Sequence, residues 1–199
     1  MYASAFVLGF HGCDREVGEM VLEGKAELKA SSNRHDWLGE GIYFWENSPR
    51  RALEWAKFLR DHPGISRRKI TEPFVVGAIV DLGRCLDLTE AASIEVVRSS
   101  FEGLREAMTA LGLDLPRNQR GSSRDEDMVK RNLDCAVIDY THLLREQASV
   151  EPYDTVRGVF QEGEPLYEGA GFREKTHIQI AVRKAASIRG YFRPKLEHA

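Results

Sequence analysis

Apolar positions along this chain fall into short runs bounded by glycine, proline or charged residues. Runs that are rich in β-branched and aromatic side chains favour strands. We predict strands over residues 5–10, 42–45, 74–82, 155–160, 178–182 and 188–192. The run over 133–144 is also apolar, but its pattern fits a strand and a helix equally well.

Two helices are predicted from their capping residues. Asp14 is a suitable N-cap for a short helix that runs to Leu22. Ser48 followed by Pro49 begins a second helix, since serine is favoured at the N-cap and proline at the first helical position. The Pro-Gly pair at 63–64 ends that second helix.

A third, longer helix is expected after Thr89, which we predict as its N-cap. Its apolar stripe comprises Ile94, Val97, Phe101, Leu104, Met108 and Leu111. Strands and helices do not alternate regularly, so a doubly wound parallel sheet is not expected. The pattern instead predicts a mixed α+β fold, and the length of 199 residues suits a single domain over 1–199.

Composition and charge describe an ordinary protein surface. Charged residues make up 30% of the chain and the net charge is -3, which implies no overall attraction to nucleic acid or to a membrane. The chain carries three widely spaced cysteines without a CxxC pair, which favours a reducing compartment and indicates no metal site. No run approaches the roughly 20 apolar residues of a membrane span. We therefore expect a soluble, cytoplasmic protein.

Three separated segments could carry chemistry. The first is His11-Gly12, which the pattern places at the end of the first strand, where a ligand can reach backbone and side chain. The second runs over 36–46 and has two glycines and four aromatic residues, which offer flat surfaces for a planar ring. A hydrogen-bonded histidine and plain aromatic core packing remain the structural alternatives for these two segments.

The third segment lies in the strand predicted over 178–182, together with the residues just before it. Alternation along the strand puts His177 and Gln179 on one face and Ile178 and Ile180 on the other. Two polar residues on one face of an apolar strand suggest the wall of a site. The alternative is an edge strand whose polar face is in water.

Together these segments resemble the signature of the poly(ADP-ribose) polymerases and of the diphtheria-toxin type of ADP-ribosyltransferase. The matching pieces are His11-Gly12, then the run Gly-Glu-Gly-Ile-Tyr-Phe at 39–44, then Ala52-Leu53-Glu54-Trp55. The clear match covers roughly a third of the chain. The resemblance implies a split antiparallel β-sheet core with peripheral helices.

The resemblance also implies that NAD⁺ is the substrate. His11 would then bind the adenosine ribose, the backbone of Gly12 would bind the nicotinamide amide, and Tyr43 and Trp55 would stack on the nicotinamide ring. Gly41 belongs to the same glycine-rich signature, and Ser32 and Asn33 would line the adenosine side. The catalytic residues would be His11, Tyr43, His177 and Gln179, and no metal is required.

One position departs from the family pattern. Members of the family use a glutamate to stabilise the cationic ribose, and an ungapped match places His177 there, with Gln179 two residues on. Neither residue is a carboxylate. Glu162 or Glu164, which precede the closing strands, could supply the missing negative charge.

The resemblance therefore implies an NAD⁺-dependent mono-ADP-ribosyltransferase that releases nicotinamide, in the manner of a bacterial toxin or anti-phage effector with an antitoxin partner. The acceptor would be a protein, or less readily RNA or DNA. A basic cluster could hold nucleic-acid phosphates, although nearby acidic residues favour an ordinary loop; its members are Arg117, Arg120, Arg124, Lys130 and Arg131. The alternatives are an inactive module that binds NAD⁺ or ADP-ribose and a protein whose aromatic residues are core.

Overall fold

The computed structural model of the chain describes residues 5–64, 69–120, 128 and 130–196. The fold is mixed α+β, as the sequence predicted. Its elements are, in chain order, β1 (Phe6–Asp14), α1 (Arg15–Leu22), β2 (Ile42–Glu46), α2 (Pro49–Asp61), β3 (Pro73–Asp81), β4 (Cys85–Asp87), α3 (Ala91–Ala110), β5 (Asn118–Gln119), β6 (Lys130–Arg131), α4 (Asn132–Gln147), β7 (Thr155–Phe160), β8 (His177–Val182), a 3-10 turn (Ala185–Ser187) and β9 (Ile188–Phe192).

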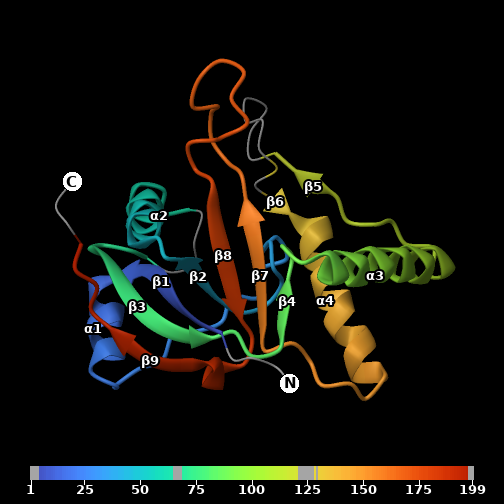
Figure 1. Cartoon of the computed structure of the whole chain (residues 1–199), viewed down its shortest axis with the longest axis horizontal. Coiled ribbons are helices and arrows are strands. Elements are labelled where there is room, and N and C mark those ends of the chain that lie inside the picture. Colours follow the sequence, from blue (N-terminus) through green and yellow to red (C-terminus); the bar gives the residue numbers. More distant parts are fainter. Residues whose placement is uncertain (1–4, 65–68, 121–127, 129, 197–199) are drawn as a thin grey trace.

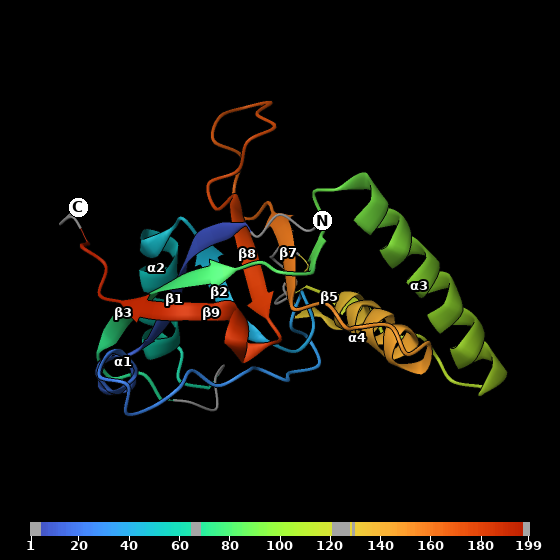
Figure 2. The same cartoon turned by 60° about the horizontal axis from the view of Figure 1, so that its bottom comes forward.

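Seven strands form one sheet in the order β4-β7-β8-β2-β1-β3-β9 (Figure 1). All neighbouring strands are antiparallel except β4 and β7, which run parallel. β5 and β6 pair separately as a small ribbon at the start of α4. Figures 1 and 2 both show the connection between β7 and β8 projecting away from the body of the molecule.

The sheet is divided at its centre. β1 pairs with β3 over nine residue pairs and β7 pairs with β8 over six, whereas β1 and β2 share only the pairs Gly9–Glu46 and Phe10–Trp45. Beyond Phe10, the strands β1 and β2 therefore separate. Two well-paired halves, β4-β7-β8-β2 and β1-β3-β9, meet through this short ladder.

Helices cover the two faces of the sheet unequally. On one face, here called the α1 face, Val21 of α1 packs in a core with Phe44, Val76 and Ile180. On the other face α2 covers β1 and β3, and α4 places Ile138 against β7 and β8. We call this second face the α2–α4 face. Figure 2 shows α3 and α4 running side by side, at the end of the molecule away from α1.

Several predicted boundaries were correct and others were wrong. β7 and β9 have the predicted bounds, and Asp14 caps α1 as expected. The first strand does not end at His11-Gly12 but continues to Asp14, because β3 pairs with it along its whole length. Thr89 is not the N-cap of α3. Glu90 holds that place, while the Thr89 hydroxyl donates to Asp87 at 2.7 Å.

The ambiguous run over 133–144 belongs to helix α4, whose buried residues lie at helical spacing. Two members of the predicted stripe on α3, Ile94 and Leu111, are exposed, so only its middle part packs. The polar loop predicted over 115–127 contains β5, and its residues 121–127 lie outside the described part of the chain. No helix in the described ranges is both long and apolar enough to cross a lipid bilayer.

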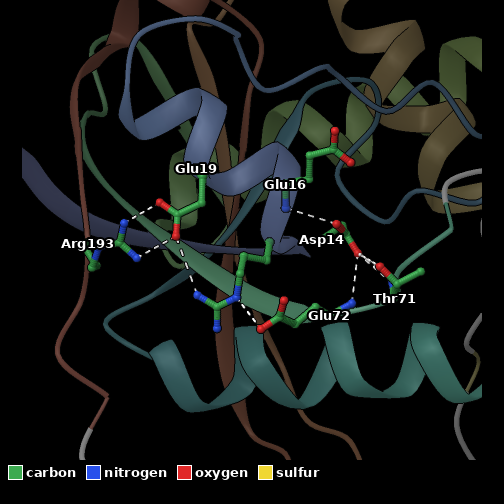
Figure 3. Close-up of polar contacts among 7 residues, drawn as sticks. Asp14, Glu16, Glu19, Thr71, Glu72 and Arg193 are labelled. Carbon is green, nitrogen blue, oxygen red and sulfur yellow. Dashed lines mark hydrogen bonds and ion pairs between the residues drawn. The ribbon is translucent and has the colours of Figure 1, made fainter.

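Asp14 links α1 to the start of β3 (Figure 3). Its carboxylate accepts hydrogen bonds from the backbone N–H groups of Glu16, Thr71 and Glu72 and from the Thr71 hydroxyl. Partial burial raises the pKa of this carboxyl, but the hydrogen bonds from Glu72, Thr71 and Glu16 outweigh it and lower the pKa from 3.8 to about 2. An ion pair between Glu19 and Arg193 adds a contact from α1 to the chain after β9.

Replacing Asp14 with alanine is expected to lower the free energy of unfolding by about 1 kcal/mol at pH 7, the usual cost of losing an N-cap. The pKa of Asp14 is lower in the folded chain, so its contribution is present above pH 3.8 and is lost as the pH falls toward 2. Urea denaturation at pH 7 and pH 2.5 checks both statements. Equal stability of the two proteins at pH 7 would contradict the capping role.

Candidate functional site

The three segments singled out in the sequence meet on adjacent strands. His11 lies on β1, Tyr43 on β2, and His177 and Gln179 on β8, and these strands are neighbours in the order β8-β2-β1. Although His11 and Tyr43 are 32 residues apart, the His11 Nδ1 atom lies 2.8 Å from the Tyr43 carbonyl oxygen, and the nitrogen donates to it. This contact lies where β1 and β2 separate.

The side chains of His11 and Tyr43 nevertheless project from opposite faces of the sheet. On the neighbouring strand β3, His11 pairs with Val76, which belongs to the core of the α1 face. The His11 ring also contacts the Phe44 ring edge-on, with 5.8 Å between the ring centroids. Tyr43 pairs with Ala181 on the neighbouring strand β8 and packs in the core of the α2–α4 face. The two rings therefore do not line one wall, and the contact between them runs through the Tyr43 backbone.

The hydroxyl of Tyr43 holds the loop before β2. It accepts a hydrogen bond from the Leu38 N–H at 2.9 Å and donates to the Gly39 carbonyl at 2.7 Å. Burial, together with the negative charge of Asp36, raises the pKa of the Tyr43 phenol well above 10. Tyr43 therefore stays neutral at physiological pH and acts as an anchor for the loop, leaving only its ring for contact with a ligand.

Gly12 lies beneath α2 on the same face as Tyr43. A Cβ atom at this position would come within 2.2 Å of the Ala52 carbonyl oxygen and 3.3 Å of the Ala56 side chain. Both alanines are fully buried. Only glycine lets α2 approach the strand so closely, so the first turns of α2 pack directly on the backbone of Gly12.

The loop over 31–41 is occupied mainly with its own contacts. The backbones of Ser31 and Gly41 pair, and Gly41 packs against β8 at Ala181. The Asn33 side chain donates to the Ser31 hydroxyl, and Asp36 accepts from the Asn33 N–H at 2.9 Å. Ser32 and Asn33 are exposed. Their predicted role in binding adenosine stays a prediction.

Trp55 lies on the same face as Tyr43 but contacts a different aromatic residue. Its ring lies 6.1 Å from that of Trp45 and stacks on Phe58 at 5.5 Å. With 41% of its surface exposed, the ring is available to a ligand. The predicted sandwich of Tyr43 and Trp55 is replaced by a row in which Trp45 lies beside Trp55.

His177 is buried and neutral. Its Nδ1 donates to the Lys175 carbonyl at 2.6 Å, and its Nε2 has no hydrogen-bond partner among the described residues. Burial lowers the pKa of His177, and the nearby positive charge of Arg51 lowers it further, against the opposing effect of the Lys175 bond. Gln179 is half-buried and pairs across the sheet with Trp45 on β2. His177 and Gln179 share the α2–α4 face, as the alternation predicted.

Two charged residues join this group from other elements. The Glu162 carboxylate lies 3.8 Å from the His177 Nδ1 and 3.7 Å from the Arg51 Nη2, and only 16% of its side chain is exposed. Arg51 lies on α2 and also binds Glu54 at 2.6 Å. Of the two glutamates proposed from the sequence, Glu162 is thus beside His177, whereas Glu164 is exposed.

We call the residues Gly12, Tyr43, Trp45, Arg51, Trp55, Glu162, His177 and Gln179 the motif site. Three buried polar atoms of this group have no hydrogen-bond partner within the described part of the chain: Trp45 Nε1, Arg51 Nε and His177 Nε2. Buried polar atoms are normally paired, because leaving one unpaired costs roughly 1–3 kcal/mol. Trp45 Nε1 on β2 and Arg51 Nε on α2 are donors, and His177 Nε2 on β8 is an acceptor. Together they could form hydrogen bonds with a polar ligand.

Two of the three cysteines are unsuited to nucleophilic chemistry. Burial raises the pKa of the Cys135 thiol to about 12 and that of Cys85 to about 11, so both stay protonated at neutral pH. Within the described ranges, no group of three or more His, Cys, Asp or Glu residues is arranged to hold a metal ion.

Sequence reasoning missed Arg51 and Trp45. Arg51 stands in an ordinary helical pattern, and its inward direction follows only from the way α2 packs on the sheet. Trp45 belonged to the aromatic segment, but its neighbours Trp55 and Gln179 come from elements that are distant in the sequence.

Comparison with known proteins adds a relative but no activity. The chain is 25% identical over 197 residues to an uncharacterized protein of Methanocaldococcus jannaschii, and the match spans 90% of this chain and 83% of that protein. No family model matches the chain. No solved structure matches it either.

Proposed function

We propose that this protein binds NAD⁺ at the motif site and transfers ADP-ribose to a macromolecular acceptor, with release of nicotinamide. The observation that carries the proposal is the meeting of three distant motif segments on the adjacent strands β8, β2 and β1, at the point where the sheet divides. The α+β fold with a divided, largely antiparallel sheet supports the same proposal. These features are what the resemblance to ADP-ribosyltransferases implies.

In the proposed complex the nicotinamide end of NAD⁺ lies on the α2–α4 face. The exposed Trp55 ring lies on this face, and the unpaired N–H groups of Arg51 and Trp45 suit the carboxamide oxygen or the ribose hydroxyls of the ligand. His11 projects from the opposite face of the sheet, so its predicted bond to the adenosine ribose is not part of this proposed complex.

The proposed reaction breaks the bond between the ribose C1′ and the nicotinamide nitrogen. Nicotinamide leaves with the bonding electron pair, and positive charge develops on C1′ and the ring oxygen of the ribose. A nucleophilic atom of the acceptor then bonds to C1′ and loses a proton. Fixed negative charge near the ribose stabilises the transition state of this step.

Glu162 is the residue that we propose for this electrostatic role. Its carboxylate is held between Arg51 and His177, close to the position that the resemblance gives to a glutamate. His177 is neutral, and its Nε2 can accept a hydrogen bond from a ribose hydroxyl. Gln179 offers a further amide on the same face.

One observation favours a second candidate function. The two polar residues of β8 on the α2–α4 face, His177 and Gln179, are not carboxylates. A neutral histidine stabilises a developing positive charge less than a glutamate would. The second candidate is therefore a module that binds NAD⁺ or ADP-ribose without transferring it.

The test uses the purified protein with NAD⁺ labelled in its adenylate part and a cell lysate. We expect NAD⁺ to raise the melting temperature, nicotinamide to be released, and label to appear in the protein or the nucleic-acid fraction. Trp55→Ala is expected to weaken NAD⁺ binding about tenfold, because stacking on an aromatic ring is worth roughly 1–3 kcal/mol. Phe6→Ala, which removes an exposed aromatic ring at the far end of β1, serves as the control.

The possible results separate the candidates. Nicotinamide release with transfer of label supports the transferase, and binding without release supports the module. If NAD⁺ neither raises the melting temperature nor loses nicotinamide, both candidates are rejected.

A further inference from the structure

A second site lies outside the motif site, between α3, α4 and the end of β7. A cavity of about 750 Å³ opens there. Its walls are mainly apolar and aromatic, and the residues that matter for its chemistry are Trp37, Arg98, Phe101, Arg131, Asp134 and Phe160. We call this cavity the α3–α4 groove. Its volume lies within the usual range for a site that takes a small organic ligand.

Arg131 gives the α3–α4 groove its charge. Its guanidinium lies over the Trp37 ring, 4.3 Å from the centroid, and 5.4 Å from that of Phe160. One nitrogen, Nη1, binds Asp134 at 3.3 Å, while the Nε atom is buried and has no partner within the described residues. A planar cation on an aromatic floor, with a donor still unused, suits a ligand that carries both a flat ring and an anionic group.

More positive charge lies on α3 and on the β5–β6 ribbon. Arg98 lines the α3 side and forms an exposed ion pair with Glu95 at 3.2 Å. Lys130 precedes Arg131 on β6, and Arg117 and Arg120 flank its partner strand β5; all three are exposed. These residues include most of the basic cluster noted in the sequence, whose member Arg124 lies outside the described residues together with the acidic run at 125–127.

The groove and the motif site share a wall. Trp37 and Phe160 line the groove, and their ring centroids lie 6.4 Å and 5.8 Å from that of His177. A ligand in the groove would thus be separated from the motif site by a single layer of aromatic rings.

From this arrangement we infer that the α3–α4 groove binds a nucleotide of a single-stranded nucleic acid. The base lies among the aromatic side chains of the groove, and Arg131 and Arg98 hold the adjoining phosphate. Stacking on aromatic rings and on arginine is the usual way in which proteins hold unpaired bases. Nucleotide binding in the groove does not depend on the proposed transferase function. Only the further step, that the bound strand accepts ADP-ribose, rests on that function.

The experiment measures binding of short fluorescein-labelled single-stranded DNA and RNA by fluorescence anisotropy, without NAD⁺. We expect both Arg131→Gln and Arg98→Gln to raise the Kd about tenfold and to reduce the slope of log K against log salt by about 1. Arg105→Gln is the matched control on α3, since Arg105 is exposed, binds Glu102 and does not line the groove. It should leave the Kd within about twofold.

Arg98 is exposed, so Arg98→Gln remains a valid test if Arg131→Gln proves unstable. Unlabelled NAD⁺ is then added as a competitor, and we expect it not to displace the oligonucleotide. The inference is overturned if the parent protein binds no oligonucleotide, if both groove variants bind like the parent, or if NAD⁺ displaces the strand. Oligonucleotide binding without any release of nicotinamide from NAD⁺ would support the groove and reject the transferase.

Discussion

Replacing Glu162 with glutamine is expected to slow nicotinamide release from NAD⁺ by about 10²–10³-fold, while NAD⁺ still raises the melting temperature. The amide has nearly the same shape, so Glu162→Gln removes the negative charge held between Arg51 and His177 with little change in packing. The loss of one preorganised electrostatic partner usually costs about 2.7–4 kcal/mol of transition-state stabilisation. Nicotinamide is quantified by chromatography at saturating NAD⁺, which separates the rate from binding.

Glu164→Gln is the matched control for this experiment. Glu164 lies two residues further along the same loop but is exposed, so its variant should release nicotinamide at the rate of the parent. If both variants match the parent, Glu162 has no electrostatic role. If Glu164→Gln alone is slow, the missing carboxylate is Glu164, and the loop must move for it to reach the ribose.

Replacing His142 with leucine is expected to make the protein much less sensitive to acid. His142 is buried in α4 against Tyr153, and neither ring nitrogen has a partner within the described residues. Burial, with smaller effects from the charges of Arg183 and Arg145, lowers the pKa of His142 from 6.5 to about 3. The folded chain therefore holds this ring neutral under conditions in which the unfolded chain protonates it.

The sign of the pH effect follows from this difference in proton binding. Because the unfolded state binds the extra proton, stability is full above pH 6.5 and falls as the pH is lowered toward 3. At about 1.36 kcal/mol for each pH unit, the parent should lose about 3 kcal/mol from this residue between pH 7 and pH 4. His142→Leu should not, and at pH 7 it should be as stable as the parent or more so, since it removes two unpaired polar atoms.

Urea denaturation at pH 7 and pH 4 measures this effect, with His35→Leu as the control because His35 is exposed. The control should retain the acid sensitivity of the parent. Equal acid sensitivity in His142→Leu and the parent would show that His142 is hydrated, or that it is protonated in the folded chain.

Local sequence signals predicted the elements whose bounds depend on neighbours along the chain. The β-branched run at 155–160 became β7, and the carboxylate of Asp14 caps α1. Elements that depend on distant partners were missed or misplaced. β4 has three residues and exists because it runs parallel to β7, and β1 extends past Gly12 because β3 pairs with it.

The same distinction holds for the candidate site. The resemblance brought His11, Tyr43 and His177 together, and the strand order places them on adjacent strands. It did not give the direction of each ring, because that follows from the register of β1 on β3 and of β2 on β8. Arg51 carried no sequence signal, since an arginine whose guanidinium turns inward has the same local pattern as one in water. Arg131 was noted only as a member of the basic cluster, and its position over the Trp37 ring could not be predicted.

The short ladder between β1 and β2 has a mechanical consequence. Each half of the sheet keeps its own backbone hydrogen bonds, through β1 and β3 on one side and β7 and β8 on the other, so the angle between the halves can change with little loss of pairing. A molecule that touched β1 and β8 at once would fasten the two halves together. Binding of such a molecule would therefore make the whole sheet more rigid.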